Sequence, residues 1–314
     1  MNQRLAILDL GTNTFHLLIV ELKENHSFEV LYKAEEFVKL GENGLDKIGE
    51  NPFQRGLEQI RKYKIIIDQY QPQQVIGFGT AAIRRAANGD DFIREIKAIC
   101  PMEVRKISGD EEAELIYSGV RQAVHLTTEP VLIMDIGGGS TEFIIADSMQ
   151  IRWKQSFPVG ASVLKQKFHH HEPITASEIN EVTIFLTAVL EPLIAQQEKF
   201  SITRLIGASG SFDTFAAMVA HQFFYATALD EKTSFEIPLE NFYSIHRQLL
   251  QNNLQQRLEM EGMIPFRAEM ITVATILAEF VIRKFNIQQI TQSGFALKEG
   301  VLWNMIHHEP GFSS

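Results

Sequence analysis

The feature that most constrains the fold of this chain is an internal duplication. The segment "LAILDLGTNTFHLLIVEL" (5–22) aligns without a gap with "VLIMDIGGGSTEFIIAD" (131–147), which pairs Asp9 with Asp135 and Thr14 with Ser140. Each copy reads as an apolar strand, an Asp-x-Gly turn and a second apolar strand. A second pair, "QVIGFGTA" (74–81) and "RLIGASGS" (204–211), follows at similar distances. The repeat predicts two homologous α/β domains that each present a hairpin to a shared cleft.

The turn of the second hairpin is suited to phosphate. Consecutive glycines let the backbone approach a ligand closely, and their N–H groups can form an anion-binding concavity. Two hydroxyl residues after them would add donors at its rim. This predicted cradle consists of Gly137, Gly138, Gly139, Ser140 and Thr141. Taken alone, the turn also fits a glycine-rich hairpin without a ligand.

Two carboxylates flank this turn, Asp135 before it and Glu142 after it. Acids beside a phosphate cradle would repel the ligand unless a hard cation lay between them. Carboxylate oxygens are ligands that Mg²⁺ prefers. The pair therefore predicts a magnesium site.

Bulk composition bounds the class of protein. A length of 314 residues with 45% apolar composition favours two domains with cores of their own. Cys100 is the single cysteine, which fits a reducing compartment, so we expect a cytoplasmic location. A formal net charge of −10 argues against nucleic acid as a partner. Since no apolar run approaches the roughly 18 residues of a spanning helix, we expect no membrane association.

Helix and strand patterns alternate along the chain, so the expected fold class is α/β. Apolar spacing predicts helices over 51–70, 110–126, 176–199, 239–258 and 269–285, and strands over 16–22, 27–40, 74–80, 102–109 and 287–294. A terminal helix is expected from about 296. We place the domains at 1–120 and 121–299, with the helix of about 300–314 packing back on the first.

Seven motifs in one order carry a family resemblance. They are "DLGTNTFHL" (9–17), "GTAAIRRAANGDDF" (79–92), "ISGDEEAELIYSGV" (107–120), "DIGGGSTEF" (135–143), "FPVGASVLKQKF" (157–168), "GASGS" (207–211) and "ALKEGVL" (296–302). The chain thereby resembles the Ppx/GppA (exopolyphosphatase/guanosine pentaphosphate phosphohydrolase) phosphatases in a short two-domain form. The resemblance implies two actin-like ATPase (ribonuclease H-like) domains with a cleft between them, and we also expect a homodimer.

The resemblance also implies roles for single residues. Glu112 matches the catalytic glutamate that positions or deprotonates water, and Arg84 matches an arginine that contacts substrate phosphate. The remaining matches to phosphate-binding positions are Thr12, Asn13, Thr14, Gly210 and Ser211. The residues alone do not separate Glu112 from Asp110 and Glu111, because any acid is favoured in the first turn of a helix. Arg85 is expected to be peripheral.

Several positions depart from the family pattern or invite other interpretations. His16 lies where some relatives carry arginine, Lys298 replaces a common arginine, and "GASGS" replaces a Gly-Gly-Thr form. The stretch "HHHE" (169–172) suggests a metal site, but a solvated loop is the expected structure. Cations that could bind the rest of a long polyphosphate as an exposed strip are Lys165, Lys167, Arg267 and Lys298.

The function predicted from these features is a Mg²⁺-dependent exopolyphosphatase that releases orthophosphate from the end of inorganic polyphosphate. The alternative is a pppGpp 5′-phosphohydrolase, so the partner is polyphosphate or a polyphosphorylated guanosine nucleotide. An actin-like kinase and a non-catalytic phosphate sensor are more distant. "VIGFGTAAIR" also fits a dinucleotide fingerprint, but the acid that should end the next strand is missing.

Overall fold

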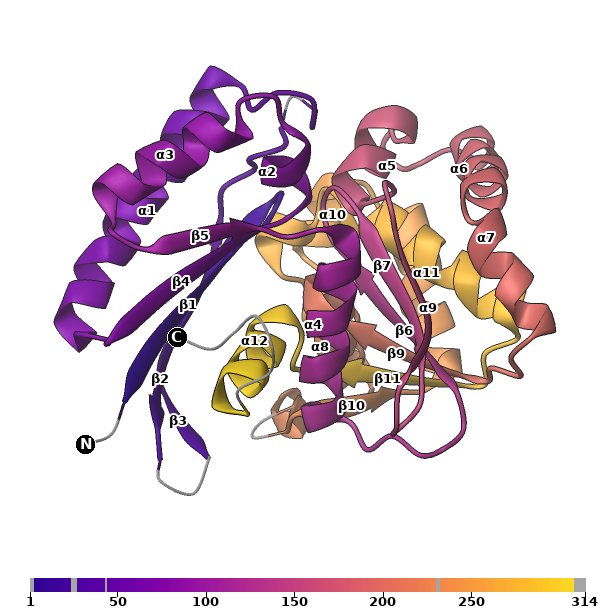
Figure 1. Ribbon diagram of the computed structural model, residues 1–314. Helices are drawn as coiled ribbons and strands as arrows, with labels where there is room; N and C mark the ends of the chain where they lie inside the picture. The colour runs from indigo at the N-terminus through magenta and orange to yellow at the C-terminus, as the bar shows by residue number, and fades with distance from the viewer. Residues whose placement is uncertain (1–2, 24–26, 43, 230–231, 308–314) are drawn as a thin grey trace. The chain divides into compact units, whose positions relative to one another are not determined.

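The computed structural model describes residues 3–23, 27–42, 44–229 and 232–307 (Figure 1). Contacts among the described residues define two compact units. Unit 1 lies within Met1–Leu115 and Leu297–Ser314, and unit 2 within Ile116–Ala296. The boundary falls inside helix α4 (Gly109–Ala123).

Unit 1 is built on a five-stranded sheet of order β3-β2-β1-β4-β5. Strands β1 and β2 form an antiparallel hairpin, whereas β4 and β5 continue the sheet parallel to β1. Helices α1 and α3 lie side by side on one face of this sheet, and α12 contacts β1 (Figure 1). The bounds are β1 Arg4–Leu10, β2 Thr14–Leu22, β3 Phe28–Phe37, α1 Glu50–Tyr70, β4 Gln74–Gly79, α2 Ala81–Arg85, α3 Gly89–Ile99, β5 Glu103–Lys106 and α12 Leu297–Ile306.

Unit 2 is built on a six-stranded sheet of order β10-β11-β9-β6-β7-β8. Its strands are β6 Val131–Ile136, β7 Thr141–Ala146, β8 Ile151–Phe157, β9 Arg204–Ala208, β10 Ser234–Ile237 and β11 Gln289–Ser293. Its helices are α5 Ala161–Phe168, α6 Ala176–Val189, α7 Glu191–Ile194, α8 Ser209–Phe223, α9 Leu239–Gln251, α10 Leu254–Leu258 and α11 Ile271–Phe285, with short 3₁₀ turns η1 Ala195–Glu198, η2 Ala226–Leu229 and η3 Pro265–Arg267.

The two sheets confirm the duplication. Read from the antiparallel side, unit 1 runs β3-β2-β1-β4-β5 and unit 2 runs β8-β7-β6-β9-β11, with β10 as an added edge strand. The residues aligned by the repeat hold equivalent places, since Asp9 lies opposite His16 across the first hairpin and Asp135 opposite Glu142 across the second. Every residue of β6 and β7 is buried, which is why these strands read as nearly continuous apolar runs.

Two of the helices expected from the sequence are interrupted. The stretch 176–199 divides into α6, α7 and η1 where Pro192 enters the first turn of α7, because proline cannot donate the hydrogen bond that would continue α6. The stretch 239–258 divides at Asn253, whose side chain caps α10 in a reciprocal bond with Gln256. In the described part of the chain, no helix has the length and apolar character that crossing a bilayer needs.

Candidate active site

An ion pair in unit 1 joins two of the predicted site residues, Arg84 at the end of α2 and Glu112 in the first turn of α4. Arg84 Nη1 donates to Glu112 Oε2 over 2.8 Å and to the carbonyl of Ile107 over 2.9 Å. The Glu112 side chain is 10% exposed. Within the described residues, Nε and Nη2 of Arg84 make no hydrogen bond. One edge of the guanidinium thus holds the carboxylate, and the other edge remains available for an oxyanion.

The three acids at the start of α4 have different surroundings. Glu111 is exposed and closes a capping box, because its carboxylate accepts from the Ser108 amide (2.7 Å) and its amide donates to the Ser108 hydroxyl (3.1 Å). Asp110 is also exposed, whereas Glu112 is buried. Burial and the arginine contact therefore distinguish Glu112, which the sequence pattern alone did not.

The tip of the first hairpin is held from behind by the residues that follow β3. The Asn13 carbonyl accepts from the amides of Val38 (2.7 Å) and Lys39 (2.9 Å), and the Thr12 carbonyl accepts from Gly41 (3.1 Å). Arg55 on α1 in turn donates to the carbonyls of Val38 and Lys39. Because the carbonyls of Thr12 and Asn13 point toward the segment after β3, the other side of the hairpin tip is the one available to a ligand.

The glycine hairpin of unit 2 is held by a helix instead. The amides of Ala161 and Ser162, at the start of α5, donate to the carbonyls of Gly137 (2.9 Å) and Gly138 (3.0 Å). Among the described residues, the amides of Gly138 and Gly139 donate to no other residue. Both carbonyls face α5, so these two N–H groups are suited to an anion.

The hydroxyls at this hairpin have different positions. Thr141 is fully buried, and its hydroxyl donates to the Val159 carbonyl over 2.6 Å. Its side chain therefore supports the fold here rather than offering a donor to a ligand. Ser140 is 5% exposed at the turn itself.

Asp135 and Glu142 form a carboxylate pair on adjacent strands of unit 2. They lie directly opposite each other in the β6–β7 register, so their side chains project on the same face. A serine supports each: the Ser209 hydroxyl donates to Asp135 Oδ2 and the Ser156 hydroxyl to Glu142 Oε1, both over 2.6 Å. Asp135 and Glu142 are 6% and 1% exposed. The pair offers an all-oxygen donor set, which suits a hard divalent cation.

Ser209, Gly210 and Ser211 begin α8 directly after β9. Ser209 adopts a left-handed backbone with φ of 62°, a conformation that directs its hydroxyl to Asp135. A Cβ placed on Gly210 would lie 1.2 Å from Arg267 Nη1, so the guanidinium packs directly on the glycine backbone. Gly210 and Ser211 are thus at a helix N-terminus, where backbone amides favour anions.

Sequence reasoning missed the two supporting serines. Ser156 lies opposite Glu142 in the β7–β8 register, and Ser209 follows Ala208, which pairs with Asp135. Register would have been the signal, because a hydroxyl in the same row of the sheet as a carboxylate can reach it. The strand that carries Ser156, β8, was not predicted from the sequence.

Other sequence expectations have mixed outcomes. The Arg85 side chain is 41% exposed, with its Nη2 3.7 Å from Asp46, and its peripheral role stays a prediction. The "HHHE" stretch is solvated at His170 and His171, but the expectation is wrong for His169, which is buried. Lys298 is also buried rather than part of an exposed strip. No cluster of three or more acids, histidines or cysteines suited to a metal occurs among the residues described.

Comparisons with known proteins agree with this arrangement. The two units, with one strand order and an Asp-headed hairpin in each, define a duplicated α/β fold. Residues 18–309 match the Ppx/GppA phosphatase family, and the chain belongs to that family. Ppx/GppA phosphatases generally depend on a divalent metal.

Three similar proteins illustrate the range of relatives. A crystal structure of an exopolyphosphatase from Cytophaga hutchinsonii is 38% identical, with a TM-score of 0.94 and 98% of both chains covered. The Aquifex aeolicus family member, at 22% identity, a TM-score of 0.81 and 99% coverage of both chains, shares the fold. A Photobacterium profundum protein named guanosine-5′-triphosphate,3′-diphosphate pyrophosphatase is 28% identical over 97% of this chain, which spans 60% of that relative's length.

Proposed function

We propose that this protein is an exopolyphosphatase that releases orthophosphate from the end of inorganic polyphosphate. The observation that carries the proposal is the Arg84–Glu112 ion pair. It joins a buried carboxylate able to accept a proton from water to a guanidinium with one edge available for phosphate oxygens.

In the proposed reaction, water attacks the terminal phosphorus in line with the bridging oxygen. The new P–O bond forms as the bridging P–O bond breaks, and the shortened chain leaves with the bonding electron pair. Glu112 accepts the proton of the attacking water. Arg84 holds Glu112 through Nη1 and stabilises charge on the transferred phosphoryl group through Nη2 and Nε.

Both hairpins bind phosphate in this scheme. The amides of Gly138 and Gly139 bind phosphate oxygens of the substrate, and we assign the same role to the tip formed by Thr12, Asn13 and Thr14. Each tip is presented with its carbonyls turned away from the ligand, which is the arrangement an anion requires.

We assign the metal of this protein as Mg²⁺, held by Asp135 and Glu142 directly or through water. Two carboxylates with hydroxyl support fit this ion, because Mg²⁺ usually takes one or two protein carboxylates and completes its shell with water and substrate phosphate. The ion would neutralise phosphate charge beside the two acids. Unit 1 has no equivalent pair across its hairpin, since His16 faces Asp9.

The substrate preference rests on the relatives. The solved relative at 38% identity is named an exopolyphosphatase, which favours polyphosphate. The Photobacterium relative is named for a guanosine nucleotide, which supports hydrolysis of pppGpp at its 5′ end as the second candidate.

Orthophosphate release from polyphosphates of defined length, pppGpp and ATP, each with and without Mg²⁺, tests the proposal. We expect Mg²⁺-dependent release that is fastest from polyphosphate. Faster release from pppGpp would replace the proposal with the second candidate. Transfer of phosphate from ATP to an acceptor would indicate a kinase, and binding without release in any condition would indicate a sensor.

A further inference from the structure

Helix α5 sets the position of the glycine hairpin. Besides the two bonds from its first amides, its N-terminal Gly160 lies against the hairpin tip. A Cβ on Gly160 would fall 2.2 Å from the Gly138 carbonyl oxygen and 2.5 Å from the Gly139 nitrogen. The backbones are therefore in direct contact, and any displacement of α5 must move the phosphate-binding turn.

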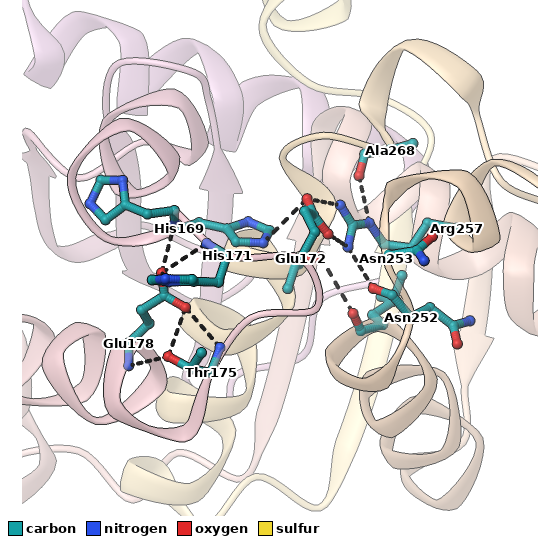
Figure 2. Close-up of polar contacts among 12 residues, drawn as sticks. His169, His171, Glu172, Thr175, Glu178, Asn252, Asn253, Arg257 and Ala268 are labelled. Atoms are coloured by element: carbon teal, nitrogen blue, oxygen red, sulfur yellow. Dashed lines mark hydrogen bonds and ion pairs between the residues drawn. The ribbon is translucent and has the colours of Figure 1, made fainter.

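The C-terminal end of α5 leads into a loop that a buried arginine holds (Figure 2). Arg257 on α10 is 0% exposed and forms a two-pronged ion pair with Glu172, with Nη1 and Nη2 each 2.7 Å from a carboxylate oxygen. Glu172 lies four residues after Phe168, the last residue of α5. The ion pair thus fixes the C-terminal end of the helix.

The same guanidinium also reaches the segment beside the other end of α5. Arg257 Nε donates to the Ala268 carbonyl over 2.9 Å, as Figure 2 shows. Two residues later, the Met270 sulfur accepts from the Ser162 hydroxyl over 3.2 Å, in the first turn of α5. A fourth hydrogen bond of Arg257, from Nη1 to the Asn252 carbonyl (2.7 Å), ties the arginine to the end of α9. Arg257 is therefore connected to both ends of the helix that supports the hairpin.

We propose that the Arg257–Glu172 pair positions the phosphate-binding hairpin of unit 2 through α5. This inference rests on the proposed function for what the hairpin binds. The mechanical part concerns the folded chain alone and is measurable without substrate. Both residues are positioning residues, since their effect on phosphate passes through the amides of Ala161 and Ser162.

The neighbouring His169 does not neutralise the charge of Glu172, so Arg257 does. The His169 ring is buried, with Nε2 3.4 Å from Glu172 Oε1, and neither ring nitrogen makes a hydrogen bond within the described residues. Burial lowers the pKa of His169, and Arg257 adds to the lowering while Glu172 opposes it. The charge of Glu178 also raises the pKa of this ring, and the charge of Lys165 lowers it. Near neutral pH, the carboxylate of Glu172 is thus balanced by Arg257.

Arg257→Lys tests the proposal because lysine keeps the charge but cannot make the planar, two-pronged contact or the Nε bond. We expect hydrogen exchange of the Ala161 and Ser162 amides, which donate to the hairpin carbonyls, to become about tenfold faster or more in the absence of substrate, as α5 loses its contact with the turn. We expect the KM for tripolyphosphate to rise about tenfold with a smaller change in kcat. Glu172→Gln, which keeps the shape of the side chain, is the milder second variant.

Asp147→Asn is the matched control for loss of stability. Asp147 lies at the far end of β7 from the hairpin and accepts from the amides of Met149 and Gln150 and from Arg152 Nε (2.7 Å). It should lower the thermal midpoint without raising hydrogen exchange of the Ala161 and Ser162 amides. The proposal is overturned if Arg257→Lys and Glu172→Gln leave that exchange no faster than the control does. If the unchanged protein releases no orthophosphate but exchange rises as expected in both variants, the positioning role stands and the proposed reaction is at fault.

Discussion

The two hairpins share one backbone frame but differ in the row of side chains beside it. In unit 1 this row runs Glu35, His16, Asp9 across three neighbouring strands, and in unit 2 it runs Ser156, Glu142, Asp135. The second row places two carboxylates side by side with hydroxyl support. The first places a histidine between its acids, with His16 Nε2 3.1 Å from the Thr14 hydroxyl. The two units share the frame, and the residues within one row distinguish the proposed metal site of unit 2 from the proposed phosphate site of unit 1.

The supports behind the hairpins differ in the same way. A loop held by Arg55, whose side chain is 39% exposed, supports the first hairpin. A helix held by the fully buried Arg257 supports the second. The buried Arg257 guanidinium makes four hydrogen bonds and loses more freedom than the partly exposed Arg55, so the second hairpin should be the more rigid of the two.

The largest expected effect comes from replacing Glu112, the proposed general base in unit 1. Glu112→Gln keeps the shape of the side chain but cannot accept a proton, so kcat should fall by roughly two to four orders of magnitude. Glu111→Gln, in the same helical turn, is the control and should retain most of the activity, because that side chain caps the helix. Steady-state orthophosphate release measures both. Equal losses of activity in the two variants would contradict the assignment of Glu112, rather than Glu111, as the base.

The next effect tests whether the metal belongs to unit 2 alone. Asp135→Asn and Glu142→Gln should each raise the Mg²⁺ concentration for half-maximal activity by roughly 10- to 100-fold, since each removes a proposed ligand. Asp9→Asn, the equivalent change in unit 1, should shift it far less. A Mg²⁺ titration of initial rates decides. If Asp9→Asn behaves like Asp135→Asn, the two rows are functionally alike and the comparison fails.

A smaller effect is expected when the side-chain row of unit 1 is given a second carboxylate beside Asp9, as in unit 2. His16→Glu places a carboxylate opposite Asp9, as Glu142 stands opposite Asp135. Added negative charge beside the first hairpin should raise the KM for tripolyphosphate about two- to fivefold without changing the Mg²⁺ requirement. His16→Gln, which adds no charge, is the control and should leave both within about twofold. A lower Mg²⁺ requirement in His16→Glu would mean that a second metal can bind in unit 1.

The smallest effect concerns the stability of unit 2 in acid. Burial lowers the pKa of His246 to about 4, with Arg283 and Arg247 contributing. Because this folded-state pKa lies below the ordinary value of 6.5, the stability is fully present above pH 6.5 and is lost as the pH falls toward 4. The slope for this group is at most about 1.4 kcal/mol per pH unit. Urea unfolding followed by hydrogen exchange of α9 and α11 should show the loss, and His246→Gln should flatten it. An unchanged slope in that variant would assign the loss to other groups.

The sequence predicted the frame better than the site. A gap-free repeat fixes which residues share a register, so the alignment of Asp9 with Asp135 was enough to predict both hairpins, while the pairing of Glu142 with Asp135 came from the structure. The resemblance chose Glu112, which the pattern alone could not separate from Glu111 and Asp110. The positions where expected helices are interrupted depend on single residues such as Pro192, and the spacing of apolar residues does not reveal them.

Contacts between distant segments were beyond sequence reasoning. Arg257 and Glu172 are 85 residues apart, and the pattern around each reads as an ordinary surface charge. Ser209 meets Asp135 across 74 residues. Such pairings follow from the packing of strands and helices, which no local period encodes.

The left-handed backbone of Ser209 has a consequence for protein engineering. Removing non-glycine residues from such conformations is a common route to a more stable variant, since each costs on the order of 1–3 kcal/mol. Glycine at position 209 would relieve that cost but would also delete the hydroxyl that donates to Asp135. A screen that selects for heat resistance alone would therefore favour the change that loosens the carboxylate pair, and stability and activity would be optimised in opposite directions at this one residue.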